Sequence, residues 1–319
     1  MPDLLDKRLI VVAGKGGVGR TTVSMIVGRS AGRRGRDTLV CLVNAPLRYA
    51  DLLGGVALGP EPRRIGERLH VANLEPRAAR EEYGLQVLQS PTLHRLVFGG
   101  RMVQAFLDAV PGLAEWAVFG KASYHALREI EGRPEYDLVI FDSPATGHGL
   151  EILSLPRAIL AGVPGGRMRE EAARRVELMA DPARFEVLPV TIPEELAVNE
   201  TIELVEALSR MGFPARRVVV NGVAVDDTLD SFAALLAGPA GQADWLLPGV
   251  ALLARREAQR RSLERLREAT GLPLLLLPQL GTGGLDEASW LSLARLFDKT
   301  VADPDPLRSG GTDEGVPVG

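Results

Sequence analysis

Gly14-Lys15-Gly16-Gly17-Val18-Gly19-Arg20-Thr21-Thr22 is the stretch that decides the fold of this chain. It follows an apolar run at 9–13 and precedes a helical pattern from Thr22 to about Arg33. A strand, a glycine-rich turn and a helix in this order form a phosphate-binding unit, because backbone N–H groups of the turn and the helix N-terminus point at one anion. The spacing matches the P-loop pattern G-x-x-x-x-G-K-[ST], except that Arg20 stands where lysine is expected.

The same glycines also satisfy G-x-G-x-x-G, the pattern of dinucleotide-binding loops. A dinucleotide site needs an acidic residue at the end of the second strand to hold a ribose, and here Asn44 follows the apolar run 38–43. That alternative also leaves Thr21-Thr22 without a role, whereas a nucleoside triphosphate with Mg²⁺ uses the Thr21 hydroxyl as a metal ligand. We therefore favour a triphosphate site.

A second motif supports a triphosphate. Asp142 ends a strongly apolar strand predicted at 136–141, which is the placement of a Walker-B carboxylate that acts near Mg²⁺. The alternative role for Asp142 is a helix N-cap. An acid between Leu-Val-Ile-Phe and Ser-Pro is unusual for structure alone, so we expect a metal-site role for Thr21 and Asp142 together.

The rest of the chain alternates strands and helices. The predicted strands are 9–13, 38–43, 69–74, 136–141, 185–191, 217–220 and 272–277. The predicted helical segments are 22–33, 82–128, 150–179, 194–211, 259–270 and 287–297, the third interrupted at Pro156 and at 163–166. This order predicts an α/β, three-layer P-loop NTPase fold, with a mostly parallel twisted sheet and helices on both faces.

We expect one domain over 1–301, with a helical insertion made of about 82–130 and 150–180. Apolar positions recur at helical spacing within 82–128, so this segment is either a layer that covers the sheet or a groove for an apolar client. We favour the layer, because Met102 is its only methionine and adaptable grooves tend to be rich in methionine. Residues 302–319 carry Pro, Gly and acidic residues, which predicts a disordered tail.

Composition excludes several classes of protein. The formal net charge of −4 argues against a nucleic-acid binder. A single cysteine, Cys41, excludes a disulfide framework or a thiolate metal cage within one chain. The N-terminus lacks the form of a signal peptide, and the longest apolar runs, such as 272–277, are too short to span a bilayer. We expect a soluble, cytoplasmic protein.

Several motifs in order resemble one family. The loop resembles K-G-G-x-G-K-[ST], with Lys15 as an additional, deviant Walker-A lysine. The other matching stretches are Asp142-Ser143-Pro144-Ala145-Thr146-Gly147-His148, Thr191-Ile192-Pro193-Glu194-Glu195, Asn199-Glu200-Thr201 and Val218-Val219-Val220-Asn221. With them the chain resembles the arsenite-pump ATPase (ArsA) and Get-pathway targeting ATPase family, within the deviant-Walker P-loop group that includes MinD and ParA. The resemblance runs from about residue 9 to residue 297.

The resemblance implies ATP and Mg²⁺ as cofactors and a dimer. Lys15 would reach phosphates across the dimer interface, Asn221 would bond the adenine edge, and Pro278 would pack on the ring. The resemblance also places His148 in a switch segment. The nucleotide-binding residues would be Gly14, Lys15, Gly16, Gly17, Val18, Gly19, Arg20, Thr21, Thr22, Asn221 and Pro278, with Thr21 and Asp142 at the metal.

Two positions depart from the family pattern. Arg20 replaces the lysine that bridges phosphates, and a longer, planar guanidinium cannot occupy the same compact position. Asn44 replaces the acid that orients or deprotonates the attacking water, and an amide cannot accept a proton. The catalytic positions would be Lys15, Asn44 and Asp142, and of these Asn44 departs from the family pattern. The single cysteine also cannot supply the family's thiolate cluster or zinc-bridging pairs.

The leading hypothesis is a dimeric ATP-binding protein with weak or lost hydrolysis that acts as a nucleotide-dependent switch or regulatory subunit. It would be a homodimer or a heterodimer with an intact paralogue. The alternative is an active ATPase that drives anion transport of the arsenite type or targets apolar, tail-anchored clients, with a membrane protein as partner. A scaffold that no longer binds nucleotide is a third interpretation.

Overall fold

A computed structural model describes most of the chain. The described residues are 3–45, 58–80, 82, 113–144, 151–224, 247–279 and 287–302. Three features expected from the sequence therefore lie outside them: the helical pattern over 83–112, His148, and the tail after Ala302.

The centre of the molecule is an 8-stranded sheet in the order β10-β9-β8-β1-β7-β2-β4-β3. Its strands are β1 Leu9–Ala13, β2 Thr38–Val43, β3 Arg63–Arg64, β4 Leu69–Leu74, β7 Leu138–Asp142, β8 Phe185–Thr191, β9 Val218–Val223 and β10 Leu274–Pro278. All pair in parallel except the short edge strand β3, which is antiparallel to β4. Strands β1, β7 and β8 are buried along their whole length and consist mostly of apolar residues, as is typical of parallel strands covered on both faces.

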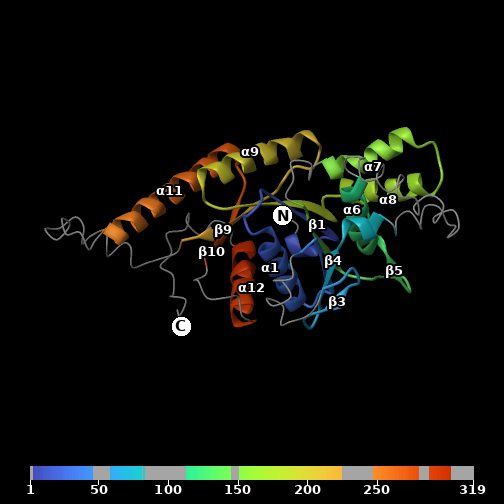
Figure 1. Cartoon of the computed structure of the whole chain (residues 1–319), viewed down its shortest axis with the longest axis horizontal. Helices are drawn as coiled ribbons and strands as arrows, with labels where there is room; N and C mark the ends of the chain where they lie inside the picture. Colours follow the sequence, from blue (N-terminus) through green and yellow to red (C-terminus); the bar gives the residue numbers. More distant parts are fainter. Residues whose placement is uncertain are drawn as a thin grey trace.

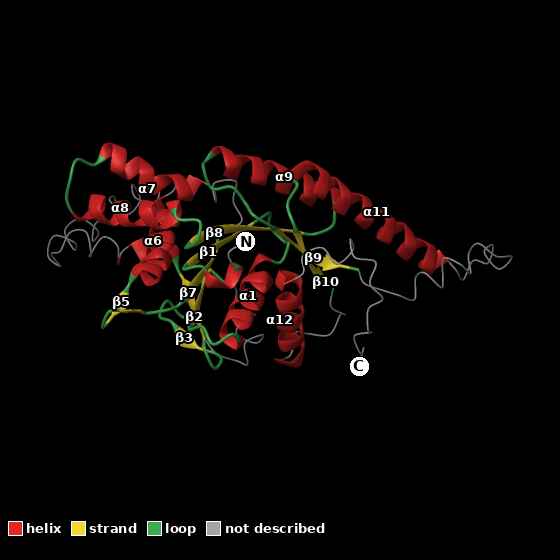
Figure 2. Ribbon diagram, turned by 180° about the vertical axis from the view of Figure 1, so that it is seen from behind, coloured by secondary structure: helices red, strands yellow, loops and turns green. Residues whose placement is uncertain are grey.

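Helices cover both faces of the sheet (Figures 1 and 2). On one face lie α1 Arg20–Arg33 and α12 Glu287–Ala302. On the other lie α6 Leu113–Leu127, α7 Glu151–Gly162, α8 Arg167–Ala180, α9 Glu195–Arg210 and α11 Leu247–Thr270. The alternation along β1 separates two cores, because Ile10 and Val12 pack with α1 while Leu9 and Val11 pack with α6 and α8. Outside the sheet, η1 Leu4–Asp6 precedes β1, and β5 Glu129–Ile130 pairs with β6 Arg133–Pro134.

The α/β fold expected from the sequence is confirmed, including the limits of β1, β2, β4 and β8. One helix is much longer than expected: α11 begins at Leu247, not at 259. Its first turns expose Val250 and Leu252 and so lack the one-sided apolar stripe that makes a helix visible in sequence.

One local expectation was wrong, and one element was not predicted. Pro156 does not interrupt its helix, because it lies buried inside α7, where apolar packing offsets the loss of one backbone hydrogen bond. The β5–β6 hairpin follows α6 directly, and Glu131 and Gly132 form its turn with positive φ of 53° and 75°. Two-residue strands leave no periodic pattern from which the hairpin could be predicted.

Candidate functional site

The predicted site residues meet at one edge of the sheet. β1 lies between β7 and β8, and Val12 of β1 pairs in register with Asp142 of β7. Since the strands are parallel, the segment after β1, the end of β7 and the end of β2 open on the same side. The strand order reverses at β1, since β7 lies on one side of it and β8 on the other. Open α/β sheets bind their ligands at the carboxyl ends of the strands at such a point.

The glycine-rich loop between β1 and α1 is packed so closely that two of its positions require glycine. A Cβ on Gly14 would lie 2.3 Å from the carbonyl oxygen of Val190 in β8. A Cβ on Gly19 would lie 2.2 Å from Nδ2 of Asn221, and Gly19 also has a φ of 87°. Val18 is buried and anchors the loop, while Lys15, Gly16 and Gly17 are exposed.

Helix α1 leaves its first N–H groups available at the loop. Gly19 is the N-cap and provides no side chain to bond them. An uncapped helix N-terminus behind a glycine-rich turn is a site for a phosphate group, because its N–H groups and the helix dipole both favour an anion. The loop geometry therefore suits the ligand that its sequence predicts.

Thr21 and Asp142 are in direct contact. The Thr21 hydroxyl donates to Oδ2 of Asp142 at 2.6 Å. Asp142 is only 7% exposed, and its other carboxylate oxygen, Oδ1, is buried without a hydrogen-bond partner. Burial raises the pKa of Asp142 from its usual 3.8 to about 6, although the Thr21 hydrogen bond, the charge of Arg20 and the nearby Ser24 hydroxyl act in the opposite direction. The Ser24 hydroxyl lies near this carboxylate without forming a hydrogen bond of normal geometry.

These two side chains fit the Mg²⁺ that the sequence predicts. A hydroxyl and a carboxylate are hard oxygen donors of the kind that Mg²⁺ uses together with phosphates and water. A buried carboxylate oxygen without a partner is costly unless a ligand engages it. A metal ion or one of its water ligands would satisfy Oδ1.

Arg20 reaches past the loop to the end of β7. Its Nη1 donates to the carbonyl oxygen of Ser143 at 2.5 Å. Ser143 is itself buried, and its N–H donates to the carbonyl of Val12 at 3.1 Å. The guanidinium thus contacts a backbone group outside the loop.

Lys15 forms an ion pair within its own chain. Its Nζ lies 2.6 Å from Oε1 of Glu200 in α9, and the two side chains are 37% and 38% exposed. The expected contact with phosphates across a dimer interface involves a second chain and stays a prediction. This lysine thus has a specific acidic partner beside the loop.

Asn221 supports the loop. Its Nδ2 donates to the carbonyl oxygen of Val18 at 3.0 Å. Asn221 lies inside β9, which continues to Val223, and Pro278 of β10 pairs in register with Val223. Asn221 and Pro278 therefore lie on neighbouring strands, as a base-binding role would need, and their predicted contacts with adenine stay a prediction.

Asn44 has an additional conformational role. It is exposed just after β2 with a φ of 48°, and its N–H donates to the carbonyl of Leu74 at 3.1 Å. Asn and Asp tolerate this left-handed conformation better than other non-glycine residues. The backbone here thus suits either Asn or the acid expected from the family, so the missing charge is not explained by conformation.

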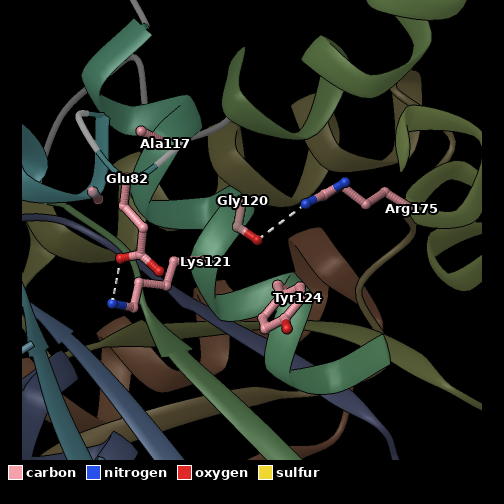
Figure 3. A pocket seen from close by; sticks show the side chains of 7 residues that line it. Glu82, Ala117, Gly120, Lys121, Tyr124 and Arg175 are labelled. Carbon is pink, nitrogen blue, oxygen red and sulfur yellow. Dashed lines mark hydrogen bonds and ion pairs between the residues drawn. The ribbon is translucent and has the colours of Figure 1, made fainter. Parts of the chain in front are cut away.

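A separate hollow, which includes no residue of the loop, is lined by side chains of α6, by Arg175 of α8 and by Ala79 and Glu82 (Figure 3). Its charged side chains are engaged with protein groups: Lys121 pairs with Glu82 at 2.7 Å, and Nη2 of Arg175 donates to the carbonyl of Gly120 at 3.1 Å. Tyr124 lines it and is exposed. Because these cations already have partners, the hollow is a weaker anion site than the loop.

Sequence reasoning did not assign roles to Ser143 or Glu200 as partners of the loop. They lie 123 and 185 residues from Arg20 and Lys15, respectively. A backbone carbonyl carries no side-chain signal, and one glutamate among several on α9 is not distinguishable by spacing. Only the fold could identify them.

The loop, the Thr21–Asp142 contact and the strand order together invite comparison with known ATPases. The family model described as "Anion-transporting ATPase" matches residues 7–164 and 166–239 of this chain. The chain belongs to this family.

Curated relatives agree with this assignment. The chain is 25% identical over 237 residues to a putative arsenical pump-driving ATPase of Halobacterium salinarum, covering 69% of this chain and 35% of that protein. It is 26% identical over 226 residues to ATPase BagA of Mycobacterium tuberculosis, covering 67% and 64%. It is 25% identical over 248 residues to ATPase GET3 of Lachancea thermotolerans, covering 66% and 71%.

The match thus spans about a third of the Halobacterium protein and less than two thirds of BagA. No helix within the described ranges combines the length and the apolar character needed to cross a membrane.

Proposed function

We propose that this member of the anion-transporting ATPase family binds Mg-ATP at a dimer interface and acts as a nucleotide-dependent switch or regulatory subunit with weak or lost hydrolysis. The backbone of 14–22 would hold the phosphates. Thr21 and Asp142 would hold Mg²⁺, which neutralises phosphate charge when bound. Asn221 and Pro278 would contact the base.

The observation that carries this proposal is the Thr21–Asp142 contact beside a tightly packed glycine-rich loop, together with the replaced residues at positions 20 and 44. The Thr21–Asp142 contact of 2.6 Å and the tightly packed loop support binding. Arg20 donates to the Ser143 carbonyl. Asn44 provides an amide instead of a carboxylate, so it cannot accept a proton from water. If each lost group is worth about 3 kcal/mol, as for other oriented charges, hydrolysis slows by two or more orders of magnitude for each.

The dimer would complete the site. Lys15 is exposed beside the loop, so a second copy or an intact paralogue that approached this face could receive it at its phosphates. Glu200 would then lose its partner, at little energetic cost because the pair is exposed.

Other parts of the proposal rest on composition and on the family. We propose a cytoplasmic protein that does not bind nucleic acid, consistent with its net charge of −4. Its partner would be a membrane protein or an apolar client. Residues 1–301 would form one ATPase-type domain with a helical insertion, followed by a tail.

The test compares ATP binding and turnover of the natural chain with those of the double variant Arg20→Lys, Asn44→Asp. Binding is measured by calorimetry with Mg-ATP, and turnover by phosphate release. We expect micromolar or tighter binding with little turnover in the natural chain, and turnover raised by tenfold or more in the double variant. The matched control is the double variant that also carries Asp142→Ala, which should abolish the gain. Absence of nucleotide binding to the natural chain would overturn the proposal.

An active ATPase is the second candidate function. It is favoured by the intact Thr21–Asp142 contact and by relatives named as arsenical pump-driving ATPases. This chain would then power anion transport or target apolar client proteins. Steady Mg²⁺-dependent phosphate release by the natural chain that disappears in Asp142→Ala would establish it in place of the switch.

A further inference from the structure

Both backbone polar groups of Ser143, its N–H and its carbonyl, are hydrogen-bonded. Its N–H bonds the carbonyl of Val12 in β1 at 3.1 Å, and its carbonyl accepts from Nη1 of Arg20 at 2.5 Å. Ser143 is 4% exposed. The next residue is Pro144, which has no N–H to contribute. The Arg20 contact thus links this end of β7 to helix α1, beside the hydrogen bond from Thr21 to Asp142.

Arg20 is also the first residue of α1, directly behind the phosphate loop. A phosphate placed against the N–H groups of 14–22 would approach the same guanidinium. Guanidinium groups bind phosphate oxygens by charge-assisted hydrogen bonds, which are stronger than bonds to a neutral carbonyl. A phosphate in the loop would therefore offer Nη1 of Arg20 a stronger acceptor than the Ser143 carbonyl.

We propose that Arg20 is a positioning residue that senses phosphate: it clamps the Ser143 carbonyl when the loop lacks a phosphate and releases it when a phosphate binds. The clamp links occupancy of the loop to the chain that leaves β7. Lysine at this position would reach the phosphates but is shorter and has no fork of donors. Arginine gives this chain a mechanical response that does not require hydrolysis. The release step rests on the proposed function, since it needs a phosphate ligand in the loop.

Hydrogen exchange at the end of β7 tests the clamp. The reporter is the Ser143 amide, followed in peptides that end at or beyond residue 143. In the natural chain this amide should be protected without ligand and exchange about tenfold faster when Mg-ADP or pyrophosphate is added, since a buried charged hydrogen bond contributes on this scale to a local opening equilibrium.

Two variants of Arg20 show whether the contact with the Ser143 carbonyl protects the Ser143 amide from exchange. In the Arg20→Met variant without ligand, the Ser143 amide should exchange about tenfold faster than in the natural chain, and added ligand should not change its rate further. Arg20→Lys keeps the charge but loses reach, so it should behave as Arg20→Met does without ligand. The matched control is Arg33→Met at the other end of α1, whose ion pair with Asp298 spans 3.7 Å; it should leave the Ser143 amide unchanged.

Each result decides one step. Equal exchange of the natural chain and both Arg20 variants without ligand would overturn the clamp. Ligand binding measured by calorimetry without faster exchange in the natural chain would overturn the release. If neither Mg-ADP nor pyrophosphate binds, the proposed function fails and the release step with it, while the ligand-free comparison still decides the clamp.

Discussion

Asp142→Asn is the substitution with the clearest expected consequence. Burial raises the pKa of this carboxyl from 3.8 to about 6. Each unit of pKa difference corresponds to about 1.4 kcal/mol, so the ionised carboxylate costs the folded state about 3 kcal/mol at neutral pH. An asparagine keeps an oxygen that can accept from the Thr21 hydroxyl, which now donates at 2.6 Å, and removes the buried charge.

The sign of the pH dependence follows from proton binding. Between about pH 4 and pH 6 the folded chain holds the Asp142 proton while the unfolded chain has released it. This group therefore lowers the free energy of unfolding as the pH rises through that window, and has no further effect above it. Asp142→Asn should stabilise the chain by up to about 3 kcal/mol at pH 7.5 and by little at pH 4.

The assay is urea unfolding of both chains across pH 4 to 7.5, with and without Mg-ADP. The difference between the chains isolates Asp142, because other titrating groups are shared. Glu206→Gln is the matched control, since Glu206 is exposed and pairs with Arg210 at 3.7 Å; it should shift the stability by less than about 1 kcal/mol at every pH. A less stable Asp142→Asn chain at pH 7.5 would refute the reasoning. Loss of the Mg²⁺-dependent stabilisation by ADP in the same variant would show that the buried charge serves the metal.

Two other substitutions examine the loop. Gly19→Ala should destabilise the chain by more than Gly17→Ala in thermal unfolding. Both positions have a φ near 87°, but only a Cβ on Gly19 would collide with Asn221, at 2.2 Å. Equal losses of stability would contradict the close packing of the loop. Lys15→Ala should change the free energy of unfolding by less than about 1 kcal/mol, because its ion pair with Glu200 is exposed. The same variant should lose ATP-dependent dimerisation in analytical ultracentrifugation, and dimerisation equal to that of the natural chain would show that Lys15 does not act across the interface.

Much of the framework follows from local sequence. Runs such as 38–43 and 185–191 contain enough apolar residues to be recognised as buried parallel strands without knowledge of their neighbours. The glycine-rich loop is equally local, since its turn and the start of α1 are determined by adjacent residues. The first turns of α11 lack such a local pattern, because their apolar residues do not recur at helical spacing, and the start of this helix was therefore not predicted.

By itself, then, the sequence determined that a phosphate loop precedes α1, that an acid ends β7, and that two expected side chains are replaced at positions 20 and 44. Only the tertiary structure decided which backbone groups Arg20 and Asn221 contact. The Ser143 carbonyl lies 123 residues from Arg20, and the Val18 carbonyl lies 203 residues from Asn221. Such contacts form because parallel strands bring their carboxyl ends to one edge, and neither residue type nor spacing specifies them.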